Sequence, residues 1–392
     1  MRMPIWPLLA TVAVQSLATM ALYSMPTLAP EVARDLKVNG ALVGGFVATA
    51  YGVGIVSALL SPSLIRRYGG VRATQAVLLA AAGMLAIAAS SAGITGIACA
   101  AIVLGMGYGA AAPASTHLLV PHTPRAMFNL VMSLRQIGVP LGGVFAALIL
   151  PPLVSLLGWR GSLLVELIPV ALLIVSMEFA RRTWDADRDP RVRPWGRTLL
   201  QPFALLRDTR FLRLSASCFI YSGLQLSFVA FMTVHLTTVV RFDLVRSGQM
   251  LAVYQIAGSV SRPIWGWIAD QYLTPMRTLA VLGTGMAVAA ALAGQFTAGW
   301  PLVEILPVVL LAGCTAGGYT GVAYAEFASL GGARRTEASG LGTALMFSGG
   351  LLIPPLFGVS ITLLGGYEVT YRAIAMLALA SAVLMWWPPA RR

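Results

Sequence analysis

Residues 62–72 read Pro-Ser-Leu-Ile-Arg-Arg-Tyr-Gly-Gly-Val-Arg, and residues 266–273 read Gly-Trp-Ile-Ala-Asp-Gln-Tyr-Leu. Both stretches are short polar turns between long apolar runs, and they begin 204 residues apart. The pair Gly107-Tyr108 recurs as Gly318-Tyr319, at a similar offset of 211 residues. Offsets near half the chain length indicate an internal duplication, in which each half of the sequence is one structural repeat.

The composition places the flanking apolar runs in a membrane. Of the 392 residues, 58% are hydrophobic and only 10% are charged. A soluble domain carries about 25% charged residues, so this chain has too little charge to cover a globule. A soluble enzyme, a secreted disulfide scaffold and a disordered chain are therefore excluded.

Long charge-poor runs follow one another along the whole chain, each able to cross about 30 Å of hydrocarbon as a helix. Alternating ten-residue strands are absent, which excludes a membrane β-barrel. We predict an all-α integral membrane protein with 12 transmembrane helices. The first run is too long for the core of a signal peptide, so it is included as a helix. The predicted spans are 5–29, 41–65, 73–91, 95–119, 126–154, 160–180, 211–236, 246–269, 277–298, 300–327, 337–363 and 368–388.

The longest polar segment divides the spans into two groups of six. We predict an N-terminal six-helix bundle at 1–180, a cytoplasmic linker at 181–210 and a C-terminal six-helix bundle at 211–392. Within the linker, residues 195–207 are expected to form an amphipathic stretch at the membrane interface.

The basic residues indicate the orientation. The net charge is +13, and 19 of the 27 basic residues lie in the loops that are cytoplasmic if the N-terminus is inside. Only six lie in the opposite loops. This positive-inside bias predicts a multi-pass protein of the cytoplasmic (inner) membrane with both termini in the cytoplasm. It also accounts for the positive charge without nucleic acid as a partner.

The two quoted turns resemble the loop motif of the major facilitator superfamily, Gly-x-Leu-Ala-Asp-Arg-x-Gly-Arg-Arg. With twelve spans and a central basic linker, the resemblance covers the whole chain. It implies two six-helix bundles around a central cavity, with rocker-switch alternating access. In that family the motif aspartate lies near a helix N-terminus and basic residues and helps to latch the cytoplasmic side, where a carboxylate gains charge-assisted hydrogen bonds in one conformer only.

The two copies of the motif are not equally complete. The second copy keeps Gly266 and Asp270, so the latch role is assigned to Asp270, with Arg277 as a candidate for its partner. The first copy has Pro62 where the family has glycine and Arg66 where it has aspartate. The remaining candidates in the first copy are Arg67, Gly69 and Arg72. An alternative is that the arginines of the first copy only establish topology.

The fifth span contains small residues and a proline at positions that favour close helix packing. They are Gly138, Pro140, Gly142 and Gly143, and their counterparts in span eleven are Gly349, Gly350 and Pro354. Small residues let a neighbouring helix approach, and proline bends the helix. The stretch resembles, imperfectly, the antiporter motif Gly-x-x-x-Gly-Pro-x-x-Gly-Gly of drug-efflux members. Packing is the favoured interpretation, and antiport is the alternative.

Arg135 is the residue on which the functional prediction depends. It lies about nine residues into the fifth span, roughly 13 Å deep at 1.5 Å per residue. A charge near the midplane is costly and is expected to face the cavity or a partner. Because arginine does not readily lose its proton, it is suited to binding a carboxylate or similar anion. The alternative is a structural ion pair with Glu166.

Other polar side chains at similar depth are candidates for the cavity, because the resemblance implies that spans one, four, seven and ten line it. These candidates, with the neighbour of Arg135, are Gln15, Tyr108, Gln136, Tyr221, Gln225 and Tyr319. A coupling proton usually needs a buried acid. Glu31 and Glu166 are the nearest candidates, so proton coupling stays open.

Several kinds of chemistry have no signal in the sequence. Three scattered cysteines and three scattered histidines give no metal-ligand spacing, and no nucleotide-binding loop of the Gly-x-x-x-x-Gly-Lys type is present. We therefore predict no metal, no cofactor and no enzyme activity, and expect a monomer. The predicted function is secondary transport of a small organic anion. Alternatives are a drug-efflux antiporter of the same fold and a non-transporting receptor or scaffold; the sequence does not identify the solute, its direction or the coupling ion.

Overall fold

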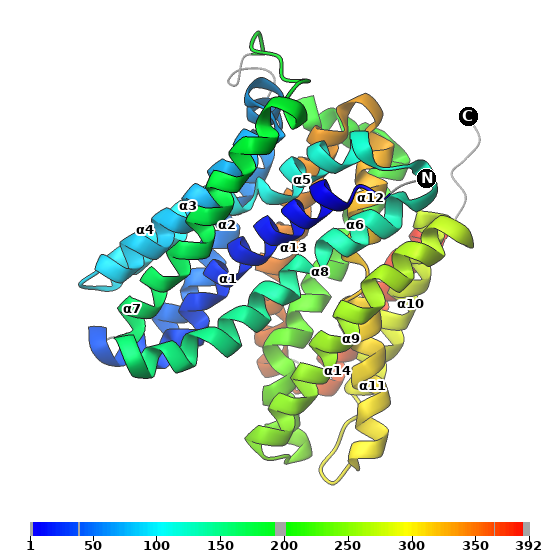
Figure 1. Ribbon diagram of the computed structural model, residues 1–392. Coiled ribbons are helices and arrows are strands. Elements are labelled where there is room, and N and C mark those ends of the chain that lie inside the picture. The colour runs from blue at the N-terminus through cyan, green and yellow to red at the C-terminus, as the bar shows by residue number, and fades with distance from the viewer. Residues whose placement is uncertain (1–2, 38–39, 193–200, 364, 387–392) are drawn as a thin grey trace. The chain divides into compact units, whose positions relative to one another are not determined.

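The computed structural model describes residues 3–37, 40–192, 201–363 and 365–386, and these residues are largely helical (Figure 1). In the first half of the sequence the α-helices are α1 (Ile5–Leu36), α2 (Gly40–Tyr68), α3 (Gly70–Ser90), α4 (Ile94–Tyr108), α5 (Ala111–Leu119), α6 (Phe128–Gln136) and α7 (Gly138–Trp184). In the second half they are α8 (Thr209–His235), α9 (Leu244–Gln271), α10 (Pro275–Ala293), α11 (Leu302–Ala316), α12 (Thr320–Gly331), α13 (Arg335–Leu363) and α14 (Tyr367–Trp386).

Short irregular helices join some of these elements. A 3-10 helix, η4 (Gln201–Arg207), precedes α8, and a π-helix, η5 (Leu236–Val240), extends it. The predicted linker is thus described up to residue 192 and again from 201. The rest of it, with much of the amphipathic stretch expected at 195–207, lies outside the described residues.

The lengths of the helices allow twelve membrane crossings. Nine segments within the described residues meet that requirement, and two of them, of 60 and 62 residues, are each long enough for two crossings. α9, with 28 residues, has the length of one more span. Large apolar side chains point outward, as on Phe179 of α7, which is 86% exposed. Such a surface is stable only against lipid.

Three predicted spans are interrupted in the structure. The spans predicted at 95–119 and 300–327 each break into two helices, α4 and α5 in the first case and α11 and α12 in the second. The span predicted at 126–154 breaks at Ile137, between α6 and α7. α7 then continues through residues 155–159, which separate two of the predicted spans, and Gly158 there has a φ of 67° and a ψ of 171° and bends the chain. Only a residue that tolerates positive φ allows this bend without strain.

The chain forms two compact units. Each unit consists mainly of one half of the sequence, together with a short segment from the other half. Unit 1 contains Met1–Pro124, Arg135–Ala204 and Gly331–Ala344, and unit 2 contains Arg125–Leu134, Leu205–Leu330 and Leu345–Arg392. Each unit therefore includes a helical segment from the other half of the sequence. These exchanged segments are most of α6 and the start of α13.

Within each unit, small residues bring helices into close contact. In unit 1, α1 packs along α7 and α2 packs against α4; in unit 2, α9 packs against α11 and α10 against α14. A Cβ on Gly109 would lie 2.0 Å from the Gly54 carbonyl oxygen, and one on Gly313 would lie 2.5 Å from the Tyr254 carbonyl oxygen. Helix backbones in a membrane approach this closely only where side chains are small.

Candidate functional site

Arg135 and Gln136 are the last two residues of α6 and are both buried. Arg135 is 0% exposed, and its guanidinium donates a hydrogen bond to the Gln136 side-chain oxygen. The helix breaks directly after this pair, and α7 begins at Gly138. Enclosing a permanent cation in a membrane segment is unfavourable unless polar groups compensate it. This is the property expected of a residue kept for function.

Gln15 and Tyr108 join one polar network in the same unit. The Gln15 amide donates to Thr19 Oγ1 at 3.1 Å, and that oxygen lies 3.2 Å from the Tyr108 hydroxyl. α1 brings this network close to the break after Gln136, because a Cβ on Gly138 would lie 2.8 Å from Gln15 Cβ. Unit 1 thus places Gln15 and Tyr108 on one network and Gln15 beside the end of α6.

The three candidates in unit 2 lie on α8 and at the break between α11 and α12. The Tyr221 and Tyr319 rings meet edge to face at 5.7 Å, and both residues are 0% exposed. The Tyr221 hydroxyl donates to the Leu279 carbonyl of α10 at 3.3 Å. Gln225, one turn further along α8, accepts a hydrogen bond from Tyr254 through its backbone carbonyl at 3.4 Å. In this structure the two tyrosines therefore contribute to the packed interior of unit 2.

Asp270 lies near the C-terminal end of α9 and contacts the N-terminal end of α6. Its carboxylate accepts from the backbone N–H of Asn129 at 3.0 Å, from the Asn129 side-chain amide at 2.8 Å and from the backbone N–H of Leu130 at 2.9 Å. The first N–H groups of a helix have no partner within the helix and carry partial positive charge. A carboxylate at that position accepts hydrogen bonds from these N–H groups and offsets their partial positive charge.

Gly266 makes the approach of α9 to α6 sterically possible. A Cβ at this position would lie 2.6 Å from Ser133 Oγ and 2.7 Å from the Asn129 carbonyl oxygen. A larger residue would therefore separate Asp270 from the start of α6. The glycine and the aspartate that the second copy retains thus contribute to the same contact.

Arg277 is not among the partners of Asp270 in the structure. Its guanidinium lies over the Trp386 ring, 6.0 Å from the centroid. Instead, Gln271, the residue that follows Asp270, donates to the Ala126 carbonyl at 3.3 Å. The expected partner was inferred from charge alone, whereas the structure satisfies Asp270 with hydrogen-bond donors of α6. Asn129 and Leu130 had no distinguishing signal in the sequence.

The first copy of the motif makes a different set of contacts. Arg66 Nη1 lies 2.9 Å from Glu337 Oε1, near the start of α13. Arg72 Nη1 lies 3.0 Å from Glu178 Oε2 on α7. Gly69 adopts a φ of 97°, in the region that favours glycine, and ends α2. Glu337 was not a sequence candidate, because nothing in its surroundings distinguishes it from an ordinary first-turn glutamate.

The segment that follows α7 packs onto this first copy. Asp185 accepts from the backbone N–H of Val71 at 2.7 Å and of Arg72 at 3.3 Å, at the start of α3. Arg67 donates to the Val192 carbonyl at 3.0 Å, and the Asp189 N–H donates to the Arg66 carbonyl at 2.9 Å. Asp185 is therefore a capping residue that was missed because it lies in the segment predicted to be only a linker.

The glycines of α7 and α13 differ in how closely their neighbours approach. A Cβ on Gly142 would lie 2.3 Å from the Ser16 carbonyl oxygen of α1, and one on Gly349 would lie 2.0 Å from the Phe219 carbonyl oxygen of α8. At Gly143 the nearest atom would be 3.5 Å away, and at Gly350 it is a flexible Leu226 methyl group. Pro140 lies in the first turn of α7, and Pro354 lies within α13 beside Pro355.

Glu166, the alternative partner for Arg135, has another contact. One of its carboxylate oxygens accepts from the Ser24 hydroxyl at 2.7 Å, and the residue is 2% exposed. No group of three or more metal-ligating side chains occurs among the described residues.

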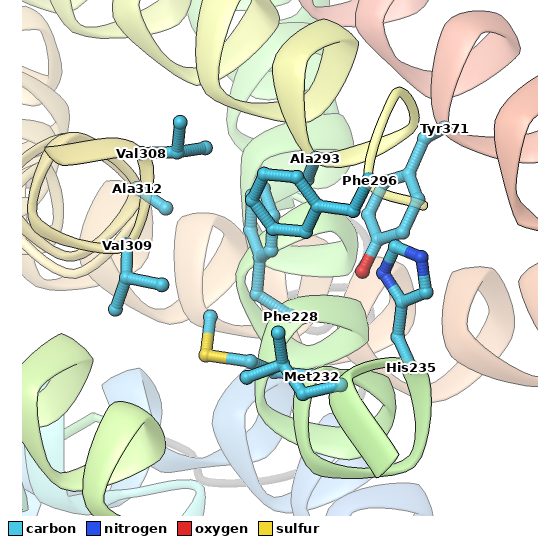
Figure 2. Close-up of a pocket in the computed structure, with 10 residues that line it drawn as sticks. Phe228, Met232, His235, Ala293, Phe296, Val308, Val309, Ala312 and Tyr371 are labelled. Carbon is cyan, nitrogen blue, oxygen red and sulfur yellow. The ribbon is translucent and has the colours of Figure 1, made fainter. Parts of the chain in front are cut away.

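A small apolar pocket lies within unit 2 (Figure 2). It is lined by side chains of α8, η5, α10, α11 and α14 and by Phe296 after α10, and Figure 2 shows the Tyr371 ring beside the His235 imidazole. The His235 ring also stacks on Tyr367 with 4.3 Å between centroids. None of the cavity candidates from the sequence lines this pocket, so it is separate from the polar network beside Arg135.

Comparison with known proteins identifies the family. The model of the Major Facilitator Superfamily matches residues 8–354. The chain belongs to this family. Family members are transporters and not enzymes, so the chain is a multi-pass membrane protein of a transporter family. The predictions of an all-α fold with twelve spans and of the family itself are confirmed.

Solved structures of the same fold cover almost the whole chain. The human organic anion transporter MFSD10 (TETRAN) has a TM-score of 0.77 at 15% identity, covering 98% of this chain and 100% of that one. The fucose:proton symporter FucP of E. coli has a TM-score of 0.74 at 13% identity, covering 98% and 99%. The proton:xylose symporter XylE has a TM-score of 0.71 at 14% identity, covering 97% and 94%. At such identities the likeness shows the fold alone.

One curated relative is similar in sequence over a shorter region. The 4-hydroxybenzoate transporter PcaK of Pseudomonas aeruginosa is 29% identical over 159 residues. The alignment covers 39% of this chain and 35% of PcaK. The similarity thus spans about a third of that relative.

Proposed function

We propose that the chain moves a small organic anion of the carboxylate class across the cytoplasmic membrane by rocker-switch alternating access. The observation that carries the proposal is the fully buried Arg135 at the end of α6. A guanidinium keeps its proton in any environment that a protein provides, so it offers a permanent positive charge to an anionic solute. Its planar donors also match the two oxygens of a carboxylate.

The names of two similar proteins favour the same class of substrate. PcaK is a 4-hydroxybenzoate transporter, and MFSD10 is an organic anion transporter. The neighbouring polar side chains Gln136, Gln15 and Tyr108 would add hydrogen bonds to the solute. A hydrophobic cation would be repelled by Arg135, which disfavours the drug-efflux alternative.

The transport cycle requires contacts that hold in one conformer and break in another. We propose that Asp270 supplies one of them through its hydrogen bonds to the start of α6, and that Gly266 permits it. The face that carries these contacts is proposed to be cytoplasmic, because most arginines of the loops lie on that side of the predicted topology.

Counterflow of labelled 4-hydroxybenzoate into proteoliposomes tests the proposal. We expect Arg135→Gln to abolish counterflow and Arg135→Lys to reduce it by about tenfold or more, because an ammonium cannot make the paired hydrogen bonds of a guanidinium. Arg262, the other arginine predicted within a span, is the matched control: its Nε donates to the Gly317 carbonyl at 2.9 Å. Arg262→Gln should lower the melting temperature but leave the KM within about twofold.

Three outcomes separate the alternatives. Wild-type counterflow in folded Arg135→Gln protein would refute the assignment of this residue. Thermal stabilisation by hydrophobic cations, with no response to carboxylates, would support drug efflux instead. No counterflow with any solute would support a receptor or scaffold. Repeating uptake with and without a pH gradient tests the proton as the coupling ion.

A further inference from the structure

The two copies of the loop motif hold opposite charges at equivalent positions. Arg66 and Asp270 are separated by the same 204 residues as the motifs themselves. Each contacts the start of a helix from the other half of the sequence: Asp270 contacts α6, and Arg66 contacts Glu337 in the first turn of α13. We call the Arg66–Glu337 contact the first latch and the contact of Asp270 with the start of α6 the second latch.

The two latches also differ in which of the two contacting helices carries the glycine. In the second latch the glycine is Gly266 of the motif, and it faces Ser133 of α6. In the first latch the motif position is Pro62, and the glycine is Gly340 of α13. A Cβ on Gly340 would lie 2.5 Å from the Ala58 carbonyl oxygen and 2.8 Å from Pro62 Cγ. The small residue required at the contact has therefore moved to the opposite helix.

We propose that Glu337 and Gly340 are positioning residues of the transport cycle that compensate for Arg66 and Pro62. The acid and the glycine missing from the first motif are supplied by α13, so that the first latch works with inverted polarity. This inference rests on the proposed function in one respect, namely that the latch has to open during transport.

The two latches differ in chemistry, which makes the proposal specific. The second latch joins a carboxylate to backbone N–H groups, whose positions depend on the helix and not on a side chain. The first latch joins two side chains, with Glu337 5% and Arg66 35% exposed. The two side chains of an ion pair can exchange their charges, with a partial loss here because position 337 lies in the first turn of α13, whereas the backbone N–H groups of α6 accept only a negative partner.

A charge-exchange experiment tests this difference. Arg66→Glu places two acids together and Glu337→Arg places two arginines together, so each single variant should lose counterflow of 4-hydroxybenzoate by about tenfold or more. The double variant Arg66→Glu/Glu337→Arg should recover to within about fivefold of the wild type, and the remaining loss reflects an arginine in the first turn of α13. Asp270→Arg is the contrasting variant. It should not be rescued by Asn129→Asp, because the N–H groups of α6 remain.

A conformational measurement keeps the test independent of the substrate. Spin labels on Thr183→Cys and Tyr272→Cys, both exposed residues, report the distance between them by double electron–electron resonance. Cys99, Cys218 and Cys314 are first replaced by alanine. The single charge variants should shift the distance distribution, and the double variant should restore it. Glu337→Asp, which keeps the charge, should stay close to the wild type in both measurements.

The steric exchange has its own test. Gly340→Ser alone should disturb the distance distribution, because the new side chain meets Pro62 and the Ala58 carbonyl. Adding Pro62→Gly removes the contact with the proline ring but not the one with the Ala58 carbonyl, so it should restore the wild-type distribution in part.

The outcomes distinguish the two proposals. If the wild type does not transport 4-hydroxybenzoate but the double charge variant restores the label distances, the substrate assignment fails and the latch stands. If the double variant remains as altered as the single variants, while melting temperatures show all of them folded, the Arg66–Glu337 latch is overturned. If a single variant does not fold, Glu337→Gln replaces it; wild-type distances and rates in that variant would also overturn the latch.

Discussion

Gly142 and Gly143 are adjacent residues of α7 with different neighbours. A Cβ on Gly142 would lie 2.3 Å from the Ser16 carbonyl oxygen and 2.7 Å from the Met20 backbone nitrogen, both in α1. Backbone atoms of a long helix cannot move aside without shifting the whole helix. At Gly143 the nearest atom would be a Tyr23 ring carbon at 3.5 Å, which is an ordinary contact. The two positions thus provide a test of close packing with an internal control.

We expect Gly142→Ala to destabilise the protein by about 1–3 kcal/mol, because overpacking forces α1 and α7 apart. Gly143→Ala should have little effect on stability. Thermal unfolding in detergent, compared with the wild type, measures both. Equal melting temperatures for the two variants would contradict the close approach of α1 to α7.

At the scale of elements, a helix start can be stabilised by a residue far away in the sequence. The start of α3 is capped by Asp185, which lies 114 residues after Val71. Burial raises the pKa of the Asp185 carboxyl above its usual 3.8, while the hydrogen bonds from Val71 and Arg72 oppose that shift. Because the folded state then binds the proton more tightly than the unfolded state, the contribution of this group to stability is greatest at low pH. It decreases as the pH rises from about 3.8 to the raised value.

Asp185→Asn removes this titration and leaves one oxygen to accept from the start of α3. The difference in melting temperature between the wild type and this variant should therefore become smaller, or change sign, as the pH rises from about 3.8. Thermal unfolding from about pH 3.5 to pH 7 measures it. A difference that grows with pH would show that the hydrogen bonds to the carboxylate outweigh burial.

At the scale of the whole molecule, each compact unit depends on both halves of the sequence. Unit 1 includes Gly331–Ala344 from the second half, and unit 2 includes Arg125–Leu134 from the first. The Asp270 contact and the Arg66–Glu337 contact each join residues of different halves within one unit. Either half expressed alone would leave the partner of each latch missing.

We therefore expect that a chain cut within residues 193–200 regains transport only when both parts are produced together. The two parts should co-purify, and counterflow should return to within about fivefold of the uncut protein, since the contacts that join the two halves within each unit can form without a peptide link between the parts. Each part alone should be recovered in much lower amount. Stable, monodisperse preparations of the separate parts would show that the exchanged helix starts contribute little.

How far the sequence predicts the site depends on the range of the interactions involved. The burial of Arg135 follows from its position in an apolar run, so it could be predicted. The contact of Asp270 with Asn129 and Leu130 spans 141 and 140 residues, and the charge pattern pointed instead to Arg277. Tyr221 was a cavity candidate by its span, yet its hydroxyl faces α10, where Gly283 leaves room for it.

The sequence alone was enough to predict the membrane class, the twelve spans and the family, because the length of an apolar run, the charges at its ends and a loop motif are local properties. The breaks between α4 and α5 and between α11 and α12 could not be predicted from hydropathy or charge, since the glycines there make close contacts with neighbouring helices that the sequence does not identify. Only the tertiary structure showed that Glu337 pairs with Arg66, that Gly340 packs against Pro62 and that Asp185 caps α3. Each of these contacts depends on which distant segment of the chain packs beside the residue, and the hydropathy pattern does not predict which segment that is.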